Sequence, residues 1–76
     1  MVTDAQRELM VADMVKSLAL LLLQKDGSLT MERALDLVFN SDTYAKVQNP
    51  ATRLYFQSPR YVFAFLEEEL RHGRVG

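Results

Sequence analysis

Few side chains in this 76-residue sequence are of the types that do acid–base or metal chemistry. The single histidine, His72, lies four residues after Glu68 near the end of the last predicted helix. A zinc site needs three or four converging ligands, and the sequence offers one histidine and no cysteine. We therefore expect no metal site, and we interpret His72 as a cation at the negative end of a helix.

The sequence is equally poor in carboxylate and hydroxyl side chains arranged for catalysis. Glu67, Glu68 and Glu69 are consecutive, so on a helix their carboxylates diverge by about 100° per step and cannot form the facing pair of a glycosidase. This run predicts a solvated helix face. The serines have no oriented base except His72, and Gly27, Gly73 and Gly76 form no phosphate-binding loop. We expect no enzymatic activity and no cofactor.

The elements that must position these residues are predicted to be helices. Thr3 or Asp4 caps a long first helix, which Gly27 ends in the left-handed conformation. Thr30 and Ser41 are predicted to cap two short helices. Ser58, followed by Pro59, is predicted to cap a last helix that runs to about His72. Residues 49–57 are expected to form an ordered loop packed on the core.

The first and last helices carry apolar side chains on more than one side. The core face of the first helix is predicted at helical spacing: Met10, Val11, Met14, Val15, Leu18, Leu21 and Leu22. Three leucines project from nearly the opposite side, and two aromatic residues lie off the core face of the last helix. We expect these five to form an interface: Leu9, Leu20, Leu23, Tyr61 and Phe65. The alternative is that short helices and the 49–57 loop cover them.

Composition limits the class of protein. Residues 1–76 make one domain, and at this size a chain buries only about 60% of its unfolded surface, so burial against a partner helps. A net charge of −1 gives no strong field for nucleic acid. The longest apolar run, residues 18–23, is too short to cross a bilayer. No cysteine is present, so we expect a cytoplasmic protein with no membrane span.

These patterns predict an all-α fold, a small bundle of about four helices. The long first helix packs on the last, and the two short helices close one end. The break at Asn40 and Ser41 also permits a helix-turn-helix, which would need a basic face of Arg33, Lys46 and Arg53. Because Asp42 makes the start of that third helix acidic, DNA binding is the less favoured alternative.

Two blocks, LTMERALDLVFNSDTYAKV from residue 29 and LYFQSPRYVFAFLEEEL from residue 54, resemble a family of short uncharacterised bacterial proteins. The resemblance implies a small operon that also encodes toxin-like proteins related to ADP-ribosyltransferases, and hence an accessory or antitoxin-like binding protein. It carries over no catalytic site, since the matched positions look like core and cap residues: Ala34, Leu35, Tyr44, Leu54, Tyr55, Ser58, Pro59, Tyr61, Val62 and Leu66.

The sequence therefore predicts a non-catalytic protein–protein interaction module. The preferred assembly is a homodimer through the leucines of the first helix. Another small bacterial protein is the second expected partner.

Overall fold

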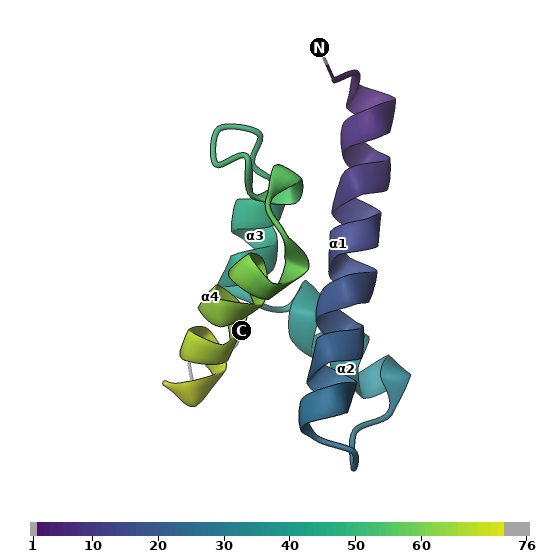
Figure 1. The fold of residues 1–76 in the computed structure, drawn as a ribbon, viewed down its shortest axis with the longest axis vertical. Coiled ribbons are helices and arrows are strands. Elements are labelled where there is room, and N and C mark those ends of the chain that lie inside the picture. Colours follow the sequence, from purple (N-terminus) through teal and green to yellow (C-terminus); the bar gives the residue numbers. More distant parts are fainter. Residues whose placement is uncertain (1, 73–76) are drawn as a thin grey trace.

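The computed structural model describes residues 2–72, and all regular structure in that range is helical (Figure 1). The order is α1 (Asp4–Lys25), α2 (Met31–Phe39), α3 (Asp42–Gln48), the single 3-10 turn η1 (Leu54–Phe56) and α4 (Pro59–Arg71). The predicted all-α fold, with the long first helix packed against the last, is confirmed. The most extensive contact of α1 is nevertheless with α2.

Each α-helix begins at a predicted cap. Thr3 accepts a hydrogen bond from the Gln6 backbone N–H at 3.1 Å, and the Gln6 side chain accepts one from the Thr3 N–H at 2.9 Å, which completes a capping box. Thr30, Ser41 and Ser58 each accept from the N–H three residues later, at 3.0 to 3.3 Å. Local hydrogen bonding therefore fixes where all four helices start.

The end of α1 differs from the prediction. Asp26 is extended there, and its Oδ1 accepts hydrogen bonds from the Ser28 N–H at 3.0 Å and from the Ser28 hydroxyl at 2.6 Å. Gly27 does not adopt the left-handed conformation, because this aspartate turn already redirects the chain. The hydrogen bonds from Ser28 hold the pKa of the Asp26 carboxyl below its usual value.

The segment between α3 and α4 packs on the core, as predicted, and it contains η1. Leu54 is buried at its start. Arg53, just before it, takes the left-handed conformation with φ 54° and ψ 22°, which is uncommon outside glycine. The Thr52 hydroxyl closes the turn by donating to the carbonyl oxygens of Lys46 and Asn49.

The core combines residues from all four α-helices and η1. The largest fully buried side chains are Leu18, Val38, Val47, Val62 and Leu66. On α1 every buried residue lies between Met14 and Leu22, and none of residues 4–13 is buried. The molecule measures 39 × 21 × 19 Å, and its long dimension follows α1, whose N-terminal half forms one edge in Figure 1.

Candidate interaction surfaces

The outer face of α1 exposes two of the three leucines expected there. Leu9 is 68% exposed and Leu20 is 43% exposed. Both lie on the side of the helix opposite the buried Leu18. Leu23 is half-buried and packs against the core, because it follows the fully buried Ala19 by one turn on a flank that the chain covers. It therefore does not join the other two.

Between Leu9 and Leu20, the same face carries opposite charges. Asp13 and Lys16 are both exposed, and at 100° per residue they lie on the same side as the two leucines. Within residues 2–72 neither of them forms an ion pair. The outer face of α1, meaning Leu9, Asp13, Lys16 and Leu20, is thus a free surface with two apolar ends and a charged centre.

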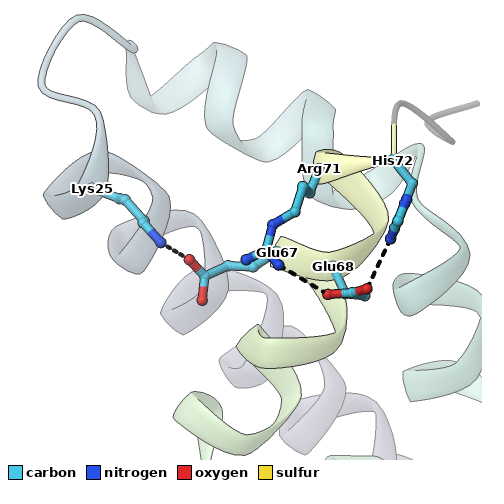
Figure 2. Close-up of polar contacts among 5 residues, drawn as sticks. All are labelled: Lys25, Glu67, Glu68, Arg71 and His72. Atoms are coloured by element: carbon cyan, nitrogen blue, oxygen red, sulfur yellow. Dashed lines mark hydrogen bonds and ion pairs between the residues drawn. The ribbon is translucent and has the colours of Figure 1, made fainter.

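The aromatic pair of α4 forms a separate surface. Tyr61 is 52% exposed and Phe65 is 40% exposed, and their rings meet edge to face with centroids 5.4 Å apart. Phe65 and Lys46 of α3 line the same hollow. Glu67 lies about 200° farther round α4 and pairs with Lys25 at the end of α1 (Figure 2). Of the five residues expected to form an interface, Leu9 and Leu20 therefore lie on the outer face of α1, Tyr61 and Phe65 lie on α4, and Leu23 packs against the core.

A groove that sequence reasoning missed runs between the N-terminal half of α1 and the α2–α3 corner. Its volume is about 490 Å³. The lining combines three helices: Val11, Val15, Leu35, Phe39 and Tyr44 form the apolar part, with Arg7, Glu8, Lys16 and Gln48 among the polar residues. Phe39, at the end of α2, is 48% exposed. It packs edge to face on Tyr44, with centroids 5.1 Å apart.

Each of the three consecutive glutamates has a different partner. Glu67 pairs with Lys25, and Glu68 bonds His72 Nε2 at 2.8 Å and Arg71 at 3.4 Å (Figure 2). The hydrogen bond with His72 holds the pKa of Glu68 below its usual value, and the charge of Arg71 adds to this. The carboxylates diverge as predicted, but a wholly solvated face is wrong, because the partly buried Glu67 ties α4 to α1.

Glu69 makes the most specific contact between helices. Its Oε2 accepts a hydrogen bond from the Asp42 N–H at 2.7 Å, and its Oε1 accepts from the Thr43 N–H at 2.9 Å and the Thr43 hydroxyl at 2.8 Å. The carboxylate of α4 therefore occupies the N-terminal amides of α3, which otherwise lack partners within the helix. Favourable interaction with the helix dipole adds to these hydrogen bonds.

This contact bears on the DNA-binding alternative. A recognition helix uses its N-terminal residues to reach base edges, and here Glu69 places a negative charge at that end of α3. The three cations that such a role would need, Arg33, Lys46 and Arg53, are exposed but lie on α2, α3 and the following loop.

Within residues 2–72, no three histidine, aspartate or glutamate side chains converge into a group able to hold a metal ion. No helix in that range has both the length and the apolar character that a membrane crossing requires. No family model, curated protein or solved structure matches the chain. The resemblance of residues 29–70 to a bacterial family therefore stays a prediction.

Proposed function

We propose that this protein is a non-catalytic protein-interaction module whose binding surface is the outer face of α1. The observation that carries the proposal is the exposure of Leu9 and Leu20 on the helix that also supplies Leu18 to the core. Exposed leucines contribute little to folding, and grouped on one helix face they are typical of a surface that binds another protein.

The proposed assembly is a homodimer, with a further role as an accessory or antitoxin-like partner of a protein encoded nearby. The small size of the domain supports self-association, since a second copy adds the apolar burial that one short chain lacks. The antitoxin-like role rests on the resemblance alone.

The test is a lysine scan of exposed apolar positions. Leu9→Lys and Leu20→Lys should dissociate the complex in sedimentation velocity at micromolar concentration, because each buries a charge in the apolar contact. The same variants should stop co-purification with the product of the neighbouring gene. Their circular dichroism should match the parent, because neither leucine belongs to the core.

Met31→Lys is the matched control, since Met31 is an exposed apolar residue on α2. This substitution should leave binding unchanged. A chain that neither self-associates nor binds any neighbouring product contradicts the proposal. Unfolding of the Leu20→Lys variant would show that Leu20 is structural, and Leu9→Lys then decides the matter.

The DNA-binding alternative predicts retardation of the promoter fragment of the protein's own gene in a gel shift at low salt. We expect none, because Glu69 sits on the N-terminus of α3 and the net charge is −1. Retardation that persists at 150 mM salt would restore this alternative.

A further inference from the structure

The leucines and charged residues on the outer face of α1 are spaced symmetrically about the middle of that face. Leu9 lies four residues before Asp13, and Leu20 lies four residues after Lys16. At 1.5 Å per residue, the two leucines are about 16 Å apart along the helix, with the two charges near the midpoint. If the direction of the helix is reversed, each leucine takes the position of the other leucine, and the carboxylate and the ammonium group exchange positions.

From this symmetry we propose that two copies of the chain pair through α1 in an antiparallel, two-fold arrangement. Leu9 packs against the partner's Leu20 at each end of the contact. At the centre, Asp13 stands level with the partner's Lys16. This inference rests on the proposed function. It assigns the outer face of α1 one occupant, a second copy of the chain, and one alignment of the two helices.

A second copy fits because a two-fold interface must be complementary to itself. In the antiparallel register two carboxylates and two ammonium groups meet at the centre, so their charges balance. A parallel pair in register sets Asp13 level with its own equivalent, and like charges placed together disfavour a contact.

The shape of the molecule leaves room for this partner. None of residues 4–13 is buried, and the N-terminal half of α1 forms one edge of the molecule in Figure 1. One pair of helices covers less than the roughly 800 Å² per partner of a standard interface. The dimer is therefore expected to be weak, with half-dissociation at micromolar concentration.

Charge reversal tests the register directly. Asp13→Lys gathers four positive charges at the centre of the contact, and Lys16→Asp gathers four negative ones, so each variant should weaken the homodimer by at least about tenfold. An equimolar mixture of the two variants should form a heterodimer as tight as the parent, because each helix then meets the opposite charge. The double variant Asp13→Lys/Lys16→Asp should recover in the same way.

Sedimentation equilibrium at about 20 mM salt is the readout, because exposed charges are screened at higher ionic strength. Asp36→Lys is the control, since it makes the same charge change at an exposed site on α2 and should leave dimerisation unchanged. Circular dichroism should show every variant folded, as neither Asp13 nor Lys16 forms an ion pair within residues 2–72.

If neither the mixture nor the double variant recovers the dimer affinity of the parent, this antiparallel register is wrong. If Leu9→Lys still dissociates the complex in that case, the proposed function stands and only the pairing geometry fails. A parent chain that stays at 8.7 kDa up to about millimolar concentration also overturns the pairing, and the proposed function then depends on co-purification alone.

Discussion

The two halves of α1 differ in what surrounds them, although both carry large apolar side chains. Between Met14 and Leu22 the helix supplies five core residues: Met14, Val15, Leu18, Ala19 and Leu22. Residues 4–13 supply none, and they include the most exposed large apolar side chain, Leu9. The C-terminal half supplies the core residues of α1, whereas most side chains of the N-terminal half are accessible to a partner.

The difference shows how a helix can persist where it supplies no buried residue and only Val11 among residues 4–13 packs against the core. A free helix shorter than about 12–15 residues is marginal in water, so residues 4–13 would not be stably helical alone. They continue a helix that is already packed, and the Thr3–Gln6 capping box satisfies its first amides. Continuity and a cap thus keep an exposed face ordered.

The largest expected effect compares one leucine from each half. Leu18→Ala should lower the free energy of unfolding by about 3 kcal/mol, because it opens a cavity at a fully buried site. Leu9→Ala should change it by less than about 0.5 kcal/mol. Urea denaturation followed by circular dichroism, on dilute monomer, measures both. Equal losses would break the contrast between the halves.

The next largest effect is expected at the hydrogen bonds that join Glu69 of α4 to the N-terminus of α3. Glu69→Ala should lower the free energy of unfolding by about 1–2 kcal/mol, because it removes three hydrogen bonds to a charged group. Glu68→Ala is the matched control and should cost much less, since its partners lie on the exposed surface near the end of the same helix. The same urea titration applies, and similar costs would contradict the assignment.

A smaller effect should stay within the exposed half. Thr3→Ala removes the cap and should favour local opening of the first turns by about 1 kcal/mol. Hydrogen exchange should then quicken in residues 4–13 and remain unchanged in residues 14–25, where opening requires loss of the core. Equal loss of protection in both halves would show that α1 opens as one unit.

The smallest effect is expected at the end of the packed half. The pKa of Asp26 is lowered by hydrogen bonds from Ser28, so this contribution to stability is complete above the usual aspartate pKa. It is lost as the pH falls through the lowered value. In a carboxyl NMR titration, Ser28→Ala should raise the midpoint of Asp26 toward its usual value. The midpoint of Glu68, which His72 lowers, should not move.

Local signals predicted the helices well. The four capping side chains were identified because each bonds an amide only three residues away. Gly27 was assigned the wrong conformation because the neighbouring Asp26 and Ser28 supplied a competing local turn. Both outcomes depend on hydrogen bonds within a few residues, which is the range where sequence reasoning is informative.

Contacts between distant residues were not predicted. Glu69 bonds amides 26 and 27 residues earlier, and no pattern in the sequence joins those positions. The groove at Phe39 was missed for a similar reason, since it forms only when α1 lies across the α2–α3 corner. An aromatic residue just before the Ser41 cap, with Tyr44 three residues beyond that cap, was the available signal.

The sequence by itself determined that α1 is one long helix and that Leu9, Leu20 and Leu23 point away from its core face, because helical periodicity is a property of adjacent residues. Only the tertiary structure decided which of those leucines remain exposed. Leu23 became half-buried while Leu9 and Leu20 stayed accessible. The physical reason is that covering a side chain depends on where the other helices lie: Leu23 shares the covered flank of α1 with the fully buried Ala19, whereas Leu9 and Leu20 lie opposite the buried Leu18.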